Sequence, residues 1–585
     1  MHGINASVIP EIKDGARLLG ADSNIGGMRN LLPMSDSEMF GAGKDPRDLR
    51  TLMRKLSARI SRDPPPSEEK RDPRPDEDKV LPEDNPNIPS GYTYLLQFLA
   101  HDMVNTSISL AATEGRRFGF QNARQQPLTL DTIYGGGPDV SPQAYEYSRL
   151  CERSRGFMPR TQLRCGRAQA RSGSTAHMPF ADIGRAVPTD ISDDGLVDRK
   201  GAPRCLRTEA LIADARNEDQ ALIAQLTLVF HRMHNFVLDQ IDRALQPSTA
   251  PDAYRNFICA RFILTLIYRK IIVKDVLYRL LDPSVYRYYF LPTTNPQNLL
   301  SDEKVIGQIP VEFSHGAFRC GHAMLRDSYR VKGAEAIDAG RAMHFNSRRS
   351  PGFVPLSEEW MVNWEHFFPL NGQPPVNLSR RLRPNFSSLA RSEFYFAPLM
   401  PNSDENGDAP GLPNRDLVSA VFARIWSVPK LIDALRAKSA EKATDLVNFL
   451  PPYDEHVSGL TAWLKETANP GGISEQFDPE DIVAIAQDPP LPFFVLYEAQ
   501  AKHHGQRLGL LGSIIIAETI AGAMQKYPLK VGSSPFDPLL QFKEQYEPLK
   551  RLGTPEGPLI RMPEIESFAD LLMFMKSNGI LEPEH

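Results

Sequence analysis

The chain has 585 residues, is 41% hydrophobic and carries a formal net charge of -5. This length and composition are enough for a large buried core, and the slightly acidic balance excludes the broad basic surface typical of nucleic-acid-binding proteins. No stretch approaches about 18 uninterrupted apolar residues, which excludes a transmembrane helix.

The first residues contain no cationic segment followed by an apolar one, so no signal peptide is expected. The default location is therefore cytoplasmic, with non-classical secretion left open. The 5 cysteines are widely spaced and form no CxxC zinc pattern, which favours a reducing compartment.

The predicted elements, in chain order, are mainly helices. Apolar residues at helical spacing predict helices over 49–60, 94–103, 221–241, 253–281, 311–329, 417–435 (interrupted at Pro429) and 491–525 (divided near residue 505). Residues 63–90 are almost all proline and charge, which indicates a linker or an extended arm, whereas 128–138 indicates a turn and 150–205 an irregular region. Few alternating strands are found, so the predicted fold class is mainly α with few short strands. We expect an N-terminal extension and arm over 1–90, one large helical domain over 91–530 and a C-terminal tail over 531–585.

The helix over 94–103 has an unusual polar pair on an otherwise apolar face. Gln97 and His101 are four residues apart, so they project from the same side, whereas Asp102 faces elsewhere. Burying such groups without partners costs about 1–3 kcal/mol each. The pair therefore predicts a polar partner or ligand beside this helix.

Four separated stretches, in this order, resemble the animal-type haem peroxidase superfamily and especially its bacterial members. They are Gln97-Phe-Leu-Ala-His101-Asp102; Ala213-Asp-Ala-Arg216-Asn-Glu-Asp219-Gln with the helix that follows; Glu312-Phe-Ser-His-Gly-Ala-Phe-Arg-Cys-Gly-His322; and Gly505-Gln-Arg-Leu-Gly-Leu-Leu-Gly-Ser-Ile-Ile-Ile-Ala-Glu518. The likeness covers about residues 90–525 and implies that the large helical domain is a haem peroxidase catalytic domain.

On the proximal side, the resemblance implies haem b as cofactor and His322 as the ligand of its iron. Arg319 matches an arginine that pairs with a haem propionate. The family places an asparagine against the proximal histidine; here Asp416 best fits that position, with Asn414 as the second candidate. Two simpler interpretations stay open: His322 as a core histidine, and Asp416 as a loop carboxylate or helix cap.

On the distal side, His101 matches the base that moves a proton between the two peroxide oxygens, and Arg216 the cation that stabilises the charge on the departing oxygen. Gln97 would orient the peroxide. The implied activity is reduction of hydrogen peroxide or an organic hydroperoxide, through a high-valent iron-oxo intermediate, with oxidation of an organic substrate. The alternative for Arg216 is an ion pair with Asp214 or Asp219.

Two departures from the family pattern concern the haem links and calcium. Ala100 stands where mammalian enzymes have an aspartate esterified to the haem, and Asp219 replaces a glutamate used for a second link. We therefore expect a non-covalent haem, with at most one ester through Asp219. The resemblance also allows a calcium site, with Asp102, Thr129 and Asp131 as ligands, but a threonine stands where a carboxylate is expected. The alternative role of the two aspartates is capping or loop hydrogen bonding.

Other functions remain open at this point. Fatty-acid dioxygenases of the same superfamily use a tyrosine three residues before the proximal histidine; Arg319 occupies that position here, although Tyr329 could serve from elsewhere. A specialised biosynthetic haem oxidase and a haem-free interaction protein are further alternatives. His231 and His234, spaced i and i+3, are interpreted as core histidines because no acidic third metal ligand accompanies them.

Overall fold

The computed structural model describes residues 28–61, 81–105, 122, 124, 126–146, 150–151, 156–157, 159–169, 177–186, 209–291, 299–302, 305–333, 335–340, 356, 358–372, 375–392, 411–466, 477–526, 553–554, 557–558 and 564–581. Most of the predicted proline-rich arm, and residues 531–552 of the predicted tail, lie outside these ranges. The described chain is mainly helical with few short strands, which confirms the predicted fold class.

The α-helices are α2 (Pro46–Ile60), α3 (Gly91–Met103), α5 (Asp131–Tyr134), α6 (Ala221–Leu245), α7 (Ala250–Ile271), α8 (Tyr278–Leu280), α9 (Pro283–Phe290), α10 (Val311–Ser314), α12 (Leu412–Phe422), α13 (Val428–Glu441), α14 (Asp454–Glu466), α15 (Pro479–Gln487), α16 (Leu491–His503), α17 (Leu510–Lys526) and α19 (Phe568–Ser577). Short 3-10 helices are η1 (Asp36–Glu38), η2 (Pro142–Ala144), η4 (Ala215–Glu218), η7 (Ala317–Met324), η8 (Glu358–Trp360), η9 (Trp364–His366), η10 (Leu370–Gly372) and η11 (Asp445–Asn448), while η5 (Ile272–Leu277) is a π-helix.

The strands form five antiparallel pairs. They are β1 (Asp84–Pro89) with β8 (Leu378–Arg380), β2 (Leu150–Cys151) with β3 (Gly156–Phe157), β4 (Cys165–Gln169) with β5 (His177–Ile183), β6 (Ser328–Tyr329) with β7 (Ile337–Asp338), and β9 (Gly553–Thr554) with β10 (Gly557–Pro558). The first pair, in the register Asp84↔Arg380 and Pro89↔Leu378, leads directly into α3.

The helices follow the apolar spacing of the sequence. Most predicted helices are present with ends shifted by a few residues, but the predicted helix over 311–329 is α10 followed by the tighter 3-10 helix η7. The break near residue 505 lies between α16 and α17, where Gly505 has a φ of +72° and a Cβ atom would lie 3.0 Å from the Leu382 carbonyl oxygen. This turn therefore requires glycine.

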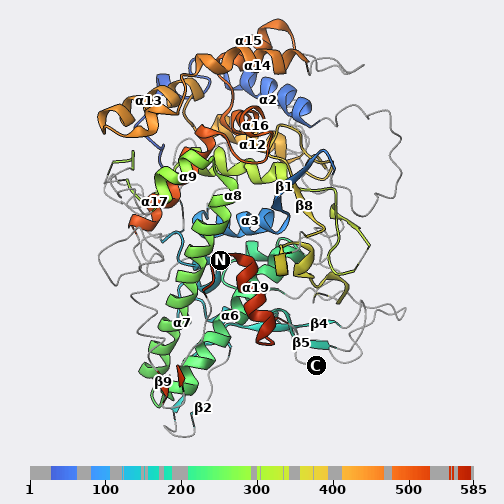
Figure 1. The fold of residues 1–585 in the computed structure, drawn as a ribbon, viewed down its shortest axis with the longest axis vertical. Helices are drawn as coiled ribbons and strands as arrows, with labels where there is room; N and C mark the ends of the chain where they lie inside the picture. The colour runs from blue at the N-terminus through green and yellow to red at the C-terminus, as the bar shows by residue number, and fades with distance from the viewer. Residues whose placement is uncertain are drawn as a thin grey trace.

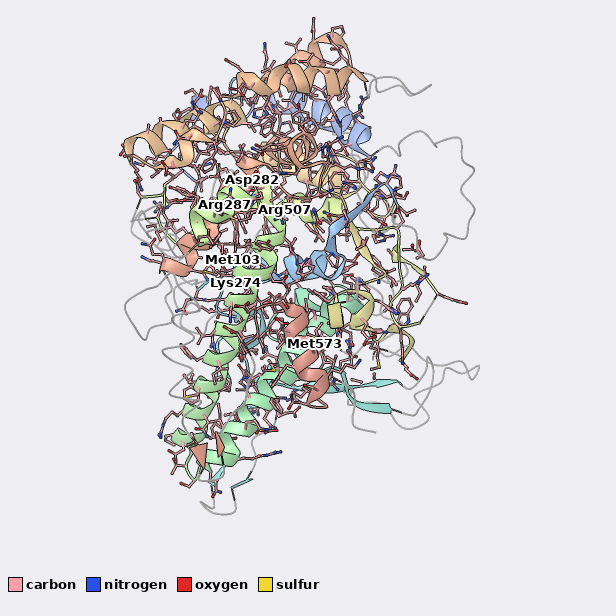
Figure 2. The ribbon with its side chains drawn as sticks, in the orientation of Figure 1. Met103, Lys274, Asp282, Arg287, Arg507 and Met573 are labelled. Carbon is pink, nitrogen blue, oxygen red and sulfur yellow. The ribbon has the colours of Figure 1, made fainter. Side chains whose placement is uncertain are left out.

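Helix α3 lies near the centre of the molecule (Figure 1). The long α6–α7 hairpin extends away from it on one side, and α2, α12, α13, α14, α15 and α16 gather at the opposite end (Figure 1). Side chains fill the space between these elements (Figure 2). Figure 2 labels Asp282 before α9 and Arg507 between α16 and α17, and Arg507 Nη1 donates to the Leu281 carbonyl oxygen at 3.3 Å. No described helix is long and apolar enough to cross a membrane.

Both predicted flanking segments contribute to the same core as the central domain. Helix α2 buries Leu49, Met53 and Leu56, and α19 buries Phe568 and Met575, all in one hydrophobic cluster that includes α3. The α19 helix, drawn in red in Figure 1, lies beside α6. Helices α2 and α19 are thus packed elements, because each has an apolar face that needs a partner.

Candidate active site

The start of α3 is fixed by the strand pair before it. Ser90 Oγ donates to the Leu378 carbonyl oxygen at 2.8 Å, and the Gly91 N–H donates to the Phe367 carbonyl oxygen at 3.1 Å. A Cβ atom on Gly91 would lie 2.4 Å from the ring of Phe368, so only glycine fits this close approach. Further along α3, Phe98 stacks on Phe230 of α6 with ring centroids 4.6 Å apart. The helix is therefore held on several sides, which orients its polar face.

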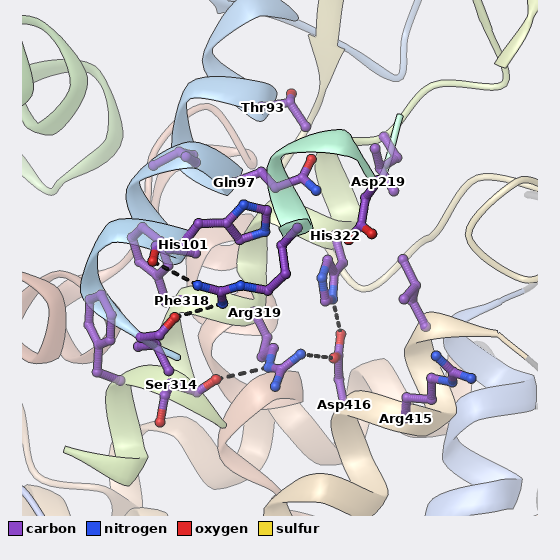
Figure 3. Close-up of a pocket in the computed structure, with 18 of the residues that line it drawn as sticks. Thr93, Gln97, His101, Asp219, Ser314, Phe318, Arg319, His322, Arg415 and Asp416 are labelled. Carbon is purple, nitrogen blue, oxygen red and sulfur yellow. Dashed lines mark hydrogen bonds and ion pairs between the residues drawn. The ribbon is translucent and has the colours of Figure 1, made fainter. Parts of the chain in front are cut away.

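A cavity of about 380 Å³ lies beside this polar face. It is lined by Thr93, Leu96, Gln97, Ala100, His101, Val104, Arg216, Asp219, Gln220, Phe313, Ser314, Phe318, Arg319, Gly321, His322, Leu325, Leu412, Arg415 and Asp416. Figure 3 shows Gln97 and His101 on one side of this cavity and His322 with Asp416 on another. The structure thus brings together Gln97, His101, Arg216, Asp219, Arg319, His322 and Asp416, seven of the residues singled out in the sequence.

The His101 side chain is buried, and its ring is held by one defined bond. Its Nδ1 lies 2.8 Å from Oδ1 of Asn217. Burial, followed by the Arg216 charge, lowers the pKa of His101 to about 3, although Asp214 partly offsets both effects. The imidazole is therefore neutral at neutral pH, as a proton acceptor must be.

Arg216 lies at the C-terminal end of α3. Its Nη1 donates to the Val104 carbonyl oxygen at 2.7 Å and its Nη2 to the His101 carbonyl oxygen at 2.9 Å. The guanidinium also pairs with Asp214, through Nε at 3.0 Å and Nη2 at 2.7 Å. These four bonds use four of the five guanidinium hydrogens, so one hydrogen on Nη1 is left for a ligand. The ion pair that the sequence allowed is thus formed with Asp214, while the side chain still lines the cavity.

Asp214 is the shared acceptor of two arginines. Besides Arg216 it pairs with Nη2 of Arg124, whose Nε donates to the His101 carbonyl oxygen at 2.8 Å. Burial alone would raise the pKa of Asp214, but the Arg216 charge and hydrogen bonds hold it well below its ordinary value. The carboxylate therefore stays ionised and fixes both guanidinium groups against the end of α3.

Gln97 is linked to a second glutamine. The Gln220 Nε2 atom donates to Gln97 Oε1 at 2.8 Å. Since that oxygen is engaged, the amide hydrogens of Gln97 remain for a ligand in the cavity. Gln97 can therefore donate a hydrogen bond to a ligand in the cavity, one helical turn from His101, which can accept one.

His322 contacts the carboxylate predicted for it. Its Nδ1 donates to Oδ2 of Asp416 at 2.7 Å, and the Arg319 Nη1 lies 3.6 Å from the other carboxylate oxygen (Figure 3). Arg319 Nε also donates to the Ser314 carbonyl oxygen at 2.9 Å. Arg319 thus pairs with a protein carboxylate while it still lines the cavity, and its match to a propionate-binding arginine stays a prediction. Asn414, the second candidate, is buried and has no hydrogen bond to His322.

These residues fit a haem group. Because the Nδ1–H of His322 is donated to Asp416, its Nε2 carries a free lone pair, and the side chain is 31% exposed at the cavity. A histidine held in this tautomer by a carboxylate is typical of histidines that ligate a metal, and histidine is a common ligand of haem iron. Across the cavity lie a neutral histidine, an amide donor and an arginine, which suit an oxygen ligand on the opposite side.

The predicted calcium ligands do not fit that ion. Asp102 is buried and accepts from the N–H groups of Leu130 and Thr132, both at 3.2 Å. Asp131 pairs with Nη2 of Arg261 at 3.0 Å, and Thr129 Oγ1 donates to Asp131 Oδ1 at 2.9 Å. Within the described ranges no group of three His, Cys, Asp or Glu side chains could hold a metal. Asp102 thus accepts from N–H groups at the start of α5, as in the capping alternative. The charge of Asp131 is balanced by Arg261, where a calcium ion was considered.

Several residues of the site were not singled out in the sequence. Asn217 stands beside Arg216 in the chain, but only its contact with His101 identifies it. Arg124 comes from a region without periodicity, and Arg415 lines the cavity next to Asp416. The adjacency of Asn217 to Arg216 was the one available signal.

His231 and His234 are core histidines, as interpreted from the sequence. His231 Nδ1 lies 2.9 Å from the Arg164 carbonyl oxygen, and His234 bridges the Tyr134 hydroxyl and the Thr161 carbonyl oxygen at 3.0 Å each. Burial lowers the pKa of His231 to about 4 and that of His234 to about 3. Both are neutral scaffold groups of α6.

Residues 168–354 match the family model described as animal haem peroxidase, a range that includes Arg216 and His322. Among solved structures, peroxidase A from Dictyostelium discoideum is similar over 96% of this chain and 95% of its own, with 12% identity and a TM-score of 0.50. A fatty acid alpha-dioxygenase from Arabidopsis thaliana (15% identity, 86% of this chain and 73% of its own, TM-score 0.48) and one from Oryza sativa (13% identity, 96% and 87%, TM-score 0.49) are also similar. No curated protein matches the sequence.

The matched range contains two of the cavity's central residues, and the fold of the whole chain agrees with that of a peroxidase. Residues 168–354 are therefore similar to the animal haem peroxidase family, and the chain as a whole shares its fold with peroxidase A.

Proposed function

We propose that this protein is a haem-dependent peroxidase that reduces hydrogen peroxide or an organic hydroperoxide and oxidises an organic substrate. The observation that supports this most directly is the opposition of two histidines across one cavity, each with its Nδ1 engaged by the protein. The engaged Nδ1 leaves Nε2 as the reactive atom of both rings. One ring then serves as a ligand and the other as a base.

Haem b, when bound, would supply the iron that coordinates the peroxide and accepts its oxidising equivalents. His322 would hold it, and Asp416 would keep the ring in the tautomer that ligates and raise its basicity. Ala100 beside His101 has no carboxylate for an ester link. Asp219 lines the cavity with a side chain one methylene shorter than the family's glutamate. Both residues favour a non-covalent haem, with at most one ester link through Asp219.

Three distal residues have different roles in the reaction with peroxide. The Nε2 atom of His101 takes the proton from one peroxide oxygen and returns it to the other as the O–O bond breaks. The amide hydrogens of Gln97 hold the bound oxygen in position. The remaining Nη1 hydrogen of Arg216 stabilises the negative charge that develops on the departing oxygen.

The test is a comparison of His322→Ala with His101→Ala. The first variant is expected to lose or change the haem absorption spectrum, because the proposed ligand is gone. The second should keep the haem but react with peroxide about 100-fold or more slowly, as removal of a general acid–base group usually causes. Normal peroxide reactivity in His101→Ala would show that another group is the base.

A fatty-acid dioxygenase is the main alternative, and two observations weigh against it. Arg319, three residues before His322, is bound to Ser314 and Asp416. Tyr329 is buried, its hydroxyl accepts from the Arg326 N–H at 2.9 Å, and no tyrosine lines the cavity among the described residues. Oxygen uptake with linoleate in the absence of peroxide separates the activities: rapid uptake would favour the dioxygenase.

A further inference from the structure

Asn217 occupies a fully buried position between the distal histidine and α5. Its Oδ1 lies 2.8 Å from His101 Nδ1. Its Nδ2 lies 3.0 Å from Thr132 Oγ1 and 3.3 Å from the Thr132 carbonyl oxygen. Asn217 is the side chain that links these two elements, and none of it reaches solvent.

The contacts of Asn217 with Thr132 decide which way its amide points. A backbone carbonyl oxygen can only accept, so the atom facing Thr132 must be the donor Nδ2. The oxygen therefore faces His101 and can only accept, which places the hydrogen of the neutral ring on Nδ1. The lone pair of Nε2 is then free on the other side of the ring.

Thr132 is itself held in place by the residue after His101. The Thr132 N–H donates to Asp102 Oδ1 at 3.2 Å, and the Leu130 N–H donates to Oδ2 at 3.2 Å. Hydrogen bonds thus connect His101 to Asn217, Asn217 to Thr132 and Thr132 to Asp102, which is the next residue in the chain after His101. This set of hydrogen bonds fixes the amide plane of Asn217 relative to α3, the helix that carries His101.

We propose that Asn217 is a positioning residue that selects the tautomer of His101, keeping the hydrogen on Nδ1 and the lone pair of Nε2 directed into the cavity. This inference rests on the proposed function, in which Nε2 of His101 accepts the proton of the peroxide. The Oδ1 atom accepts from Nδ1–H before and after that transfer, so the ring gains and loses its second proton without turning. The transfer needs no further proton donor or acceptor, because the proton that leaves one peroxide oxygen returns to the other.

Without this acceptor the buried Nδ1–H has no partner, and the two tautomers of the neutral ring become comparable in energy. The other tautomer places a hydrogen on Nε2 and cannot accept a proton there. The charged groups around the ring are Arg216 and Asp214 before α6, Arg124, and Asp102 on α3. Across the cavity are Asp219, Arg319, Arg415, and the pair of His322 with Asp416. Asn217 is the side chain whose hydrogen bond to a ring nitrogen of His101 the structure shows.

The experiment compares Asn217→Leu, Asn217→Asp and Asn256→Leu with the unchanged protein. Asn256 is a buried asparagine of α7 that donates to Asp242 at 2.7 Å, so its replacement controls for loss of a buried amide. The readouts are haem binding, the second-order rate with hydrogen peroxide as a function of pH, and the 15N chemical shifts of His101 in histidine-labelled protein without haem. The His101→Ala spectrum identifies the His101 signals.

Asn217→Leu is expected to bind haem, react with peroxide about 10- to 100-fold more slowly and show mixed His101 tautomers, the range expected of an orienting partner. Asn217→Asp keeps an acceptor for Nδ1–H and should restore most of the rate. Its acid limb should move to higher pH, because a neighbouring anion favours the protonated ring. Asn256→Leu should leave all three readouts unchanged.

A single Nδ1–H tautomer and an unchanged rate in Asn217→Leu would overturn the inference, as would an Asn217→Asp variant with an unchanged pH profile. The tautomer measurement needs no peroxide chemistry. If His101→Ala reacts normally while Asn217→Leu still mixes the tautomers, the proposed function fails and the tautomer assignment stands.

Discussion

Replacing Asp416 by alanine removes the only described hydrogen-bond acceptor of His322 Nδ1. The bond is 2.7 Å long, and the carboxylate side chain is 4% exposed. A hydrogen bond to a charged group contributes about 1.5–3 kcal/mol, which corresponds to a loss of about 10- to 100-fold in affinity. The same range is typical when the partner of a metal-ligating histidine is removed. We therefore expect Asp416→Ala to bind haem about 10- to 100-fold more weakly.

Asp416→Asn separates the hydrogen bond from the charge. Its amide oxygen still accepts from Nδ1–H, so the orientation of His322 is retained and the affinity should fall less than about tenfold. The reduction potential of the haem iron in this variant should rise, because a neutral partner makes the His322 imidazole a weaker electron donor to the iron. Asp219→Asn, which removes another carboxylate of the cavity, is the charge control and should keep the ligation spectrum.

The assay is titration of the haem-free protein with haem, followed by its absorption spectrum, with dissociation measured by transfer to a competing apoprotein. Unchanged affinity in Asp416→Ala would refute the reasoning, since the bond would then contribute nothing to ligation. Equal losses in Asp219→Asn and Asp416→Asn would attribute the effect to cavity charge instead.

Three further outcomes follow from the scaffold. Acidification should destabilise the protein through His231, because the pKa of its ring is 6.5 in the unfolded chain and about 4 in the folded one. The free energy of unfolding that this group contributes above pH 6.5, about 3 kcal/mol, is lost as the pH falls toward 4. In denaturant titrations at pH 6.5 and pH 4, His231→Asn should therefore lose less stability than the unchanged protein. A calcium chelator should leave the Tm unchanged, because Asp102 caps α5 and Asp131 pairs with Arg261; a clear fall in Tm would contradict that assignment. Phe568→Ala should destabilise the fold by about 3–5 kcal/mol, because its ring is fully buried against Phe230 and Phe368, whereas an equal effect from the half-buried Met573→Ala would argue against this packing.

The sequence by itself determined the helices whose apolar residues recur at a regular spacing. The polar pair Gln97 and His101 was visible because two residues four apart share a helix face whatever the tertiary structure. The break near Gly505 was visible because glycine ends helices for a local steric reason. The resemblance then assigned His322 and Arg216 their expected places.

Only the tertiary structure decided the hydrogen-bond partner of His101 and chose Asp416 over Asn414 as the partner of His322. Asp416 lies 94 positions from His322, and Asn217 lies 116 positions from His101. Contacts at such separations leave no periodic signal, because they depend on how helices pack rather than on local spacing. The same reason explains why Asp102 caps α5, why arginines stand where calcium was considered, and why α19 belongs to the core.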